Sequence, residues 1–193
     1  MRVISVFLTE HDLRLVLLAA FVALSGSWVA LGLFHRAGEK LGTQRYGWTF
    51  LAAVAAGASV WCTHFISILA FDVRAPISFD PLLTMFSLLI AIAGCGTGFH
   101  IALRYKNGQL PEAGGAFIGL ALAAMHYTGM MAYRIDGVIA WSTGYVVASV
   151  AMAVVLCAMA LRQAVRKPWA HAHHAAMGLF VLADLSMHFT GMT

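Results

Sequence analysis

Charged residues are scarce in this sequence. It contains 12 Lys and Arg and 8 Asp and Glu among 193 residues, or 10% of the chain. Soluble domains carry about 25% charged and about 45–50% apolar residues, whereas apolar residues make up 61% here and the mean hydropathy is +0.83. This composition excludes a water-soluble globular domain, a disordered segment and a nucleic-acid-binding module. The sequence therefore predicts an integral membrane protein with the lipid bilayer as its surroundings and no nucleic-acid partner.

Proline and cysteine are also scarce, with 4 and 3 residues. The four prolines, at positions 76, 81, 111 and 168, lie in loops or at the ends of apolar stretches, which favours continuous membrane helices. The odd number of cysteines, all inside apolar stretches, excludes a disulfide framework. We therefore expect helix packing alone to hold the fold together.

Six apolar stretches are each long enough to cross a bilayer, which takes roughly 20 helical residues. No alternating strand pattern competes with them, and helices satisfy the backbone polar groups in lipid. We expect an all-α, polytopic bundle of transmembrane helices that forms one domain over residues 1–193. The six expected spans are Leu15–Phe34, Trp48–Phe71, Leu82–Leu103, Gly115–Tyr133, Val138–Leu161 and Ala175–Thr193.

The positive charges alternate between the loops on the two sides of this expected bundle. By the positive-inside rule, the side with more Lys and Arg faces the cytoplasm, which places both termini outside. The richer side carries Arg36, Lys40, Arg45, Arg104, Lys106, Arg162, Arg166 and Lys167, and the other side carries Arg2, Arg14, Arg74 and Arg134.

A repeat of 62 residues runs through the chain. It separates His64 from His126 and His126 from His188, which all lie in even-numbered spans. The repeat predicts three two-helix units near residues 12–73, 74–135 and 136–193. The same offset relates Ser25, Ser87 and Ser149, as well as Cys95 and Cys157, and Gly57 and Gly119.

Each unit crosses the membrane twice, so all three units enter it in the same direction. The three histidines must then lie at one depth, on helices related by a rough threefold repeat. His64 precedes the expected helix end at Phe71 by seven residues, or about 10 Å at 1.5 Å per residue. Three imidazoles at equal depth near the outer face can converge on one point in the bundle.

Methionines accompany two of these histidines. His126 and Met130 are four residues apart, as are His188 and Met192, so each pair shares a helix face. Imidazole and thioether together form a soft nitrogen–sulfur set that suits copper. The alternative is that the histidines bond neighbouring helices and the methionines fill gaps in packing. The threefold recurrence at one depth favours the metal site.

The first and third units each have a special feature. In the first unit, Ile68 replaces the methionine, so this unit offers His64 with the thiol of Cys62 nearby. In the third unit, Asp184 lies four residues before His188 and has no acidic counterpart in the other units. Asp184 either orients and charge-balances His188 or makes an interhelical hydrogen bond, and the sequence leaves both roles open.

The tetrad Met125-His126-Tyr127-Thr128, with its variants at the 62-residue interval, resembles the bacterial MHYT sensor domain over essentially the whole chain. The resemblance implies a multi-pass domain of the bacterial inner membrane, with its motifs toward the periplasm and a seventh span beyond Thr193. It also implies bound copper, a diatomic gas ligand such as dioxygen, carbon monoxide or nitric oxide, and a cytoplasmic output domain such as a cyclic-di-GMP enzyme.

Carried over by position, the resemblance marks the motif residues of the second and third units. The first unit departs from the pattern at Thr63, Ser67 and Ile68. Asp184, Tyr127 and Cys62 are expected in the layer of side chains around the ligands. The expected ligands are His64, His126, His188, Met125, Met130, Met187 and Met192.

The sequence thus predicts a membrane sensor that holds copper and signals to a separate output domain. It contains no nucleophile, paired carboxylates or cofactor loop that suggests catalysis, so we do not expect an enzyme. The alternative is a transporter of copper or protons that uses the histidines and Asp184 along its path. Haem with axial histidines is a third reading.

Overall fold

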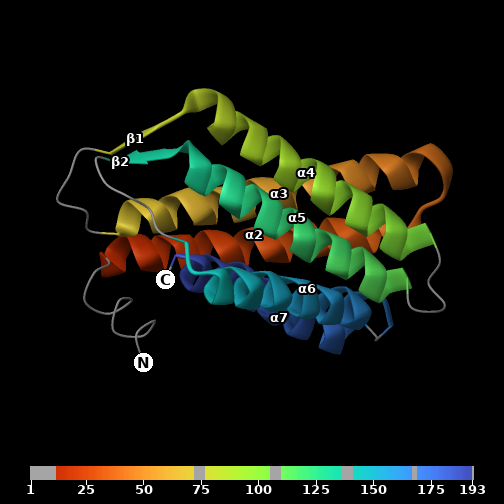
Figure 1. Ribbon diagram of the computed structural model, residues 1–193. Coiled ribbons are helices and arrows are strands. Elements are labelled where there is room, and N and C mark those ends of the chain that lie inside the picture. The colour runs from red at the N-terminus through yellow and green to blue at the C-terminus, as the bar shows by residue number, and fades with distance from the viewer. Residues whose placement is uncertain (1–11, 72–76, 105–109, 136–140, 167–168, 193) are drawn as a thin grey trace.

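The computed structural model describes residues 12–71, 77–104, 110–135, 141–166 and 169–192, and these form a helical bundle (Figure 1). The predicted all-α polytopic fold is confirmed. The described elements are α2 (Leu13–Glu39), α3 (Gly42–Ala70), β1 (Ile77–Phe79), α4 (Pro81–Arg104), α5 (Leu110–Ala132), β2 (Tyr133–Ile135), α6 (Thr143–Arg166) and α7 (Trp169–Gly191).

Several helix ends differ from the predicted spans. The fifth span was expected from Val138, but α6 begins at Thr143, and residues 138–140 lie outside the described part of the chain. Tyr133, expected in the fourth span, belongs to β2 because α5 ends at Ala132. Thr193, the expected end of the sixth span, is also outside the described residues.

Local sequence signals set three of the helix starts. Asp12 caps α2 by accepting a hydrogen bond from the backbone N–H of Arg14 at 2.8 Å. Asp80 precedes α4, whose first residue is Pro81, and proline is favoured at this position because the N–H that it lacks has no helical partner there. The tight connection from α2 to α3 passes through Gly42, whose φ of 57° favours glycine.

Five of the six described helices are long and apolar enough to cross a membrane. The exception is α7, whose hydropathy is lowered by polar side chains including His174, Asp184 and His188. It nevertheless has 23 residues and packs against α6 and α2 within the same bundle. The chain is therefore a multi-pass membrane protein in which α7 is the most polar helix.

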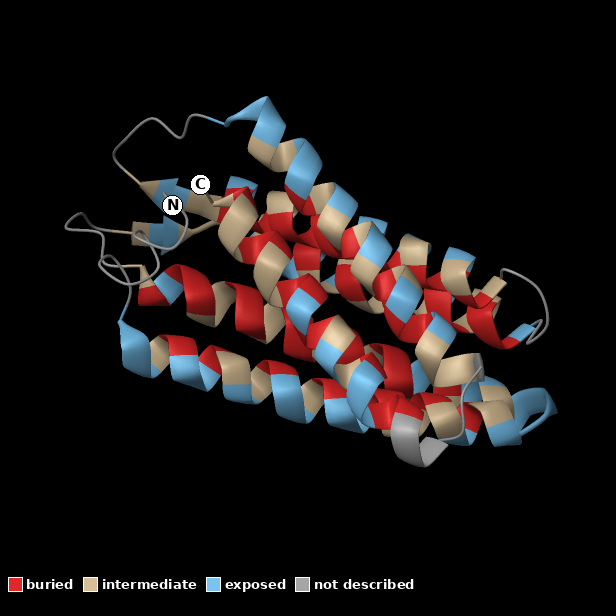
Figure 2. Ribbon diagram, turned by 90° about the horizontal axis from the view of Figure 1, so that it is seen from below, coloured by how far each residue is buried: buried red, intermediate tan, exposed pale blue. Residues whose placement is uncertain are grey.

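The helices form a closed ring in chain order, because α7 packs on α2 as well as on α6. More than half of the apolar window of α3 and of α5 is buried, against a third or less for α2, α4 and α6. Figure 2 shows the buried residues facing the bundle interior and the exposed ones facing outward. The second helix of each unit is thus an inner helix and the first is an outer one.

The 62-residue repeat is visible in the packing between units. A Cβ placed on Gly57 would lie 2.7 Å from the backbone nitrogen of Ile92 on α4, and one on Gly119 would lie 2.5 Å from the backbone oxygen of Ala153 on α6. Only glycine allows these approaches. The two residues are related by the offset, so the α3–α4 and α5–α6 contacts are built in the same way.

A small antiparallel sheet was not predicted. Strands β1 and β2 pair Ile77 with Ile135 and Phe79 with Tyr133, at the end of the bundle where α3 and α5 end (Figure 1, left). Three-residue strands are too short to produce a readable alternation in the sequence. We call this end of the bundle the histidine end, because the next section places the three histidines near it, and the other end the opposite end.

Candidate metal centre

The structure brings the three predicted histidines together. His64 on α3, His126 on α5 and His188 on α7 are buried, with 1%, 1% and 2% of their surface exposed. The Nδ1 atom of His64 lies 3.1 Å from Nδ1 of His126 and 3.1 Å from Nδ1 of His188. One potential ligand atom from each residue lies within 4.8 Å of the others. Within the described part of the chain, this is the one group of three or more His, Cys, Asp or Glu side chains arranged in this way.

The three rings meet edge to face. Their centroids are 4.8 Å apart for His64 and His126, 5.1 Å for His64 and His188, and 5.3 Å for His126 and His188. The interplanar angles are 69°, 80° and 90°, so the rings are far from coplanar and none stacks face to face on another. The ring nitrogens of all three lie within a few ångströms of one another in this arrangement.

Hydrogen bonding alone does not satisfy this arrangement. A ring nitrogen carries either one hydrogen or one lone pair, so Nδ1 of His64 cannot complete a full hydrogen bond to both neighbouring Nδ1 atoms. A cation between the rings would accept one lone pair from each. Metal–nitrogen bonds of about 2.0–2.1 Å place such ligand atoms about 3.3–3.6 Å apart. The observed 3.1 Å is a few tenths of an ångström short of that spacing, so the residues fit a metal ion after a small outward shift.

Two glycines seat the outer edges of these rings. A Cβ on Gly191 would lie 2.7 Å from Nε2 of His126, and a Cβ on Gly129 would fall directly on Nε2 of His64. Among the described residues, neither of these Nε2 atoms has a hydrogen-bond partner. Each of these glycines follows the histidine of its own unit by three residues and lies against the imidazole of the preceding unit. The Thr-Gly pairs of the motif carried this signal, but their spacing alone does not say which side chain they accommodate.

The predicted methionine ligands are mostly buried. Met125 packs in the main apolar core together with residues such as Leu122, and Met187 packs with Ala123 and Ala153. Met130 is 6% exposed and lies one turn after His126. Met192 is partly exposed beyond the end of α7. Apolar packing explains the burial of Met125 and Met187, and ligation by any of the four thioethers stays a prediction.

Tyr127, predicted in the layer around the ligands, contacts His126. Its ring meets His126 edge to face at 4.9 Å, and its hydroxyl lies 2.7 Å from Oγ of Ser149 on α6. Cys62 has a free, partly exposed thiol, one helical turn or less from His64 along α3. The hydrogen bond to Ser149 fixes the orientation of the Tyr127 ring against the imidazole.

Asp184 is buried on α7, with 5% of its surface exposed. Its Oδ2 atom has no hydrogen-bond partner in the described structure, so the interhelical hydrogen bond considered above is not made by this atom. Cys95 on α4 and Cys157 on α6, which are both fully buried, lie within electrostatic range of Asp184. The sequence did not indicate this link to the repeated cysteine pair.

Aromatic side chains from the sheet cover the histidine end. Phe65 packs edge to face on His64, Phe79 of β1 packs on Phe65, and Tyr133 of β2 lies 5.7 Å from Phe79. These rings form a continuous apolar layer from the outer sheet to the imidazole of His64. The layer separates this side of the centre from the outside.

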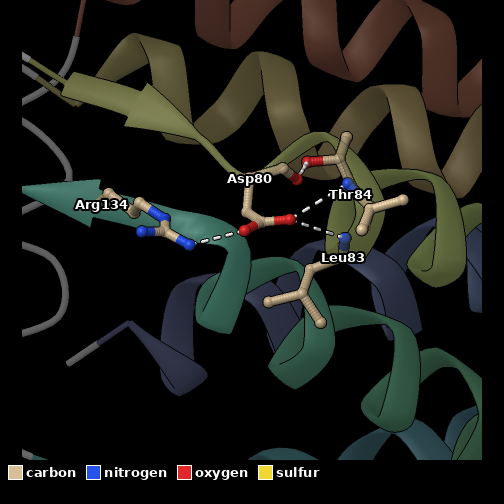
Figure 3. A network of polar contacts seen from close by, with 5 residues as sticks. Asp80, Leu83, Thr84 and Arg134 are labelled. Atoms are coloured by element: carbon tan, nitrogen blue, oxygen red, sulfur yellow. Dashed lines mark hydrogen bonds and ion pairs between the residues drawn. The ribbon is translucent and has the colours of Figure 1, made fainter.

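A polar network holds the sheet on the bundle (Figure 3). Arg134 of β2 donates to Oδ2 of Asp80 at 2.5 Å, and Oδ1 of Asp80 accepts from the backbone N–H groups of Leu82 and Leu83 at the start of α4. The N–H of Leu83 and then the guanidinium of Arg134 hold the pKa of Asp80 below its usual 3.8. Asp80 therefore joins the connection between α3 and α4 to the connection between α5 and α6. An Asp-Pro pair before an apolar run signals its capping role, but nothing in the sequence indicates Arg134 as its partner.

Comparison with known proteins agrees with this architecture. Residues 57–115 and 119–177 each match the sequence profile of the family described as "MHYT: Bacterial signalling protein N terminal repeat". The two matches begin 62 residues apart, the same offset that relates the histidines. No solved structure matches the chain.

Three curated relatives are signalling proteins or cyclic-di-GMP enzymes by name. An uncharacterized signaling protein of Caulobacter vibrioides is 36% identical over 185 residues, which are 96% of this chain and 23% of that protein. The cyclic di-GMP phosphodiesterase NbdA of Pseudomonas aeruginosa is 34% identical over 92% of this chain and 24% of its own length. The bifunctional diguanylate cyclase/cyclic di-GMP phosphodiesterase MucR of the same organism is 28% identical over 96% and 28%.

The chain thus spans about a quarter of the length of the curated relatives that it matches. The matched segments cover the part of the chain from the middle of α3 to the first turns of α7, and they repeat the inner and outer helices in the same order. With more than half of its residues matched by the family profile, the chain belongs to the MHYT family of bacterial signalling proteins.

Proposed function

We propose that this chain is the membrane sensor domain of a signalling protein and that it binds one copper ion through His64, His126 and His188. The observation that carries the proposal is the convergence of three buried Nδ1 atoms, two pairs of them 3.1 Å apart. A soft nitrogen site, with thioethers on the same helices, suits copper better than magnesium or calcium.

The signal in this proposal is a diatomic gas or a change of redox state. Copper with three protein ligands keeps a coordination position open to a diatomic molecule and can change its oxidation state. The histidines lie on the inner helices α3, α5 and α7, so a sub-ångström change at the centre acts on all three units at once. Packed helices respond to such changes by shifts of about 1–2 Å.

The output of the signal lies outside these 193 residues in this proposal. Two of the relatives are named as cyclic-di-GMP enzymes, and the chain matches only about a quarter of each. We therefore propose a cytoplasmic cyclic-di-GMP enzyme as the output, and an orientation in the inner membrane with the histidine end toward the periplasm. The charge asymmetry of the loops supports this orientation.

Metal analysis of the purified protein tests the copper site. We expect one copper per chain in wild-type protein and less than a tenth of that in His126→Ala. The matched control is His174→Ala, because His174 is an exposed histidine on α7, away from the centre. Wild-type protein without stoichiometric copper, or His126→Ala with an unchanged content, refutes the proposal. A Soret band in the optical spectrum would assign the histidines to haem instead.

Transport is the competing function, and the described helices do not favour it. Transporters of this kind bind their substrate where helices are broken. The two described prolines of the bundle, Pro81 and Pro111, lie in the first turns of α4 and α5, so neither interrupts a span. Copper uptake into proteoliposomes by the wild-type protein, lost in His126→Ala, would establish transport in place of sensing.

A further inference from the structure

A second site lies at the opposite end of the bundle, far from the histidines. A half-enclosed cavity of about 240 Å³ opens between the first turns of α3 and the last turn of α4. The side chains that matter for its chemistry are those of Arg45, Tyr46 and Thr49 from α3 and of His100 and Arg104 from α4. We call this cavity the arginine pocket.

The arginine pocket is positively charged. Arg45 and Arg104 contribute a guanidinium each from two different helices, and the described residues that line the pocket include no carboxylate. Arg45 is held at the pocket because its Nε atom donates to the backbone oxygen of Lys40 at 2.8 Å. His100 is stacked on the ring of Tyr46, with centroids 5.7 Å apart and planes at 18°. Guanidinium groups contributed by two helices are an arrangement that can recognise a phosphate.

The start of α3 adds to this positive potential. The N-cap residue is Leu41, which makes no side-chain hydrogen bond to the helix, and the first turn contains no acidic residue. The first N–H groups of this 29-residue helix therefore have no side-chain acceptor. Gly42 brings them to the lining of the pocket. A helix start of this kind attracts an anion.

The repeat supplies an internal comparison. The contact between α3 and α4 corresponds to the contact between α5 and α6, where Glu112 pairs with Arg162 at 3.7 Å. By the 62-residue offset, Arg162 corresponds to His100 and Glu112 corresponds to Phe50. The second and third units are thus joined by an ion pair, whereas the residues at the equivalent positions between the first and second units, Phe50 and His100, include no acidic side chain. A phosphate in the pocket would bring to this contact the negative charge that Glu112 brings to the other.

The surroundings of the pocket indicate a lipid as the source of that anion. Tyr46 and Phe50 are four residues apart on one face of α3, and they are 61% and 62% exposed. Phe50 lies one turn further toward the membrane interior than Tyr46. A phosphate between the arginines would therefore have an apolar, outward-facing helix surface beside it. Basic pockets between helices at a membrane interface are typical sites for anionic lipid head groups.

We propose that the arginine pocket binds the phosphodiester of an anionic phospholipid, with Arg45 and Arg104 on the phosphate and the acyl chains along the Phe50 face of α3. A free phosphodiester offers the same charge and the same oxygen acceptors, so the experiment must separate the lipid from its soluble head group. The site is independent of any metal at the histidine end.

Native mass spectrometry of the delipidated, detergent-solubilised chain tests the proposal. The probes are phosphatidylglycerol, phosphatidylcholine and soluble glycerophosphoglycerol. We expect one tightly bound phosphatidylglycerol per chain, at least tenfold tighter than phosphatidylcholine, with binding that weakens as salt is added. The double variant Arg45→Gln/Arg104→Gln should bind phosphatidylglycerol at least tenfold more weakly. The matched control Arg162→Gln, which changes the equivalent contact, should bind it like wild type.

Three results would overturn the proposal. Equal affinity of wild-type protein for the two lipids would show that charge is not recognised. An unchanged affinity in the double variant would place the lipid elsewhere, and glycerophosphoglycerol that binds as tightly as the lipid would make this a site for a soluble anion. If the double variant fails to fold, as judged by circular dichroism, the salt dependence and the lipid preference of the wild-type protein still decide the question.

Discussion

The seating of His126 against Gly191 leads to a quantitative prediction. Substituting alanine at Gly191 would place a Cβ 2.7 Å from Nε2 of His126 and 3.3 Å from the Tyr127 hydroxyl. Ordinary contacts between heavy atoms are about 3.5–4.0 Å, so the imidazole must move by about 0.8 Å or more. Metal sites tolerate changes of only about 0.2 Å in ligand distance. We therefore expect Gly191→Ala to lower the copper content at least tenfold.

The same substitution should also destabilise the fold. Inserting one methyl group into a packed site costs about 1–3 kcal/mol. Replacing a helical glycine by alanine returns about 0.5–1 kcal/mol, so the expected net loss lies between about 0 and 2.5 kcal/mol. The matched control is Gly178→Ala on the same helix, because a Cβ there meets no atom within 4 Å. This control should keep its copper and melt slightly higher than wild type.

Thermal unfolding in detergent and copper analysis of the same samples provide the two measurements. A Gly191→Ala protein with wild-type copper content and wild-type melting temperature would refute the seating of His126. If Gly178→Ala lost as much copper and stability as Gly191→Ala, the effect would come from replacing a helical glycine in general and not from the contact with the imidazole. The stability measurement tests the packing whether or not the wild-type protein retains its copper during purification.

Three further predictions concern side chains around the centre. Asp80→Asn keeps a side-chain acceptor for the helix cap but removes the negative charge. The pKa of Asp80 lies below 3.8, which means that the folded protein stabilises the ionised carboxylate. The melting temperature of the wild-type protein should therefore be higher than that of this variant at neutral pH. The difference should disappear as the pH falls through that lowered pKa, and a difference that persists in acid would contradict the pairing with Arg134. Asp184→Leu should melt at or above the wild-type temperature and gain up to about 3 kcal/mol of stability, because it removes a buried carboxyl group whose Oδ2 has no hydrogen-bond partner among the described residues. A loss of copper in this variant would establish its role in charge balance, whereas a lower melting temperature would contradict the burial argument. Tyr127→Phe removes the hydrogen bond to Ser149 and should cost about 0.5–1.5 kcal/mol with unchanged copper; a copper loss would mean that the hydroxyl orients His126.

The histidine cluster could be predicted from the sequence because the repeat fixes depth. A constant offset of 62 residues over two membrane crossings places His64, His126 and His188 at equal heights on parallel helices. Parallel helices in a closed ring then bring equivalent residues to one end. The inner helices α3 and α5 are less apolar than the outer helices α2, α4 and α6, and α7 is the most polar of all. The sequence therefore carried a signal for which helix of each unit faces the interior, although the prediction of the spans did not use it.

Other features of the centre depend on contacts between distant segments. Asp80 and Arg134 lie in different loops, and their pairing follows from strand register, which three-residue strands do not reveal in a sequence. The proximity of Asp184 to Cys95 and Cys157 depends on how three helices rotate about their own axes. The spans were predicted with errors of a few residues at their ends, since hydropathy does not mark the caps that terminate a helix.

The repeat is not perfect at the three histidines, and it departs from symmetry between the third unit and the first, where α7 packs on α2. Gly129 lies against the imidazole of the first unit and Gly191 against that of the second, and the residue of the first unit at the equivalent position is Ser67. Ser67 is fully buried, and its Oγ has no hydrogen-bond partner among the described residues. A serine fills space that the glycines leave empty, and the two centroid distances to His188, 5.1 and 5.3 Å, exceed the 4.8 Å between His64 and His126. His188 also shares its helix with Asp184, which the other units lack. His188 is thus distinct from the other two histidines in its packing and in the acidic residue on its helix, so a signal at the proposed centre would act unequally on the three units and most directly on α7.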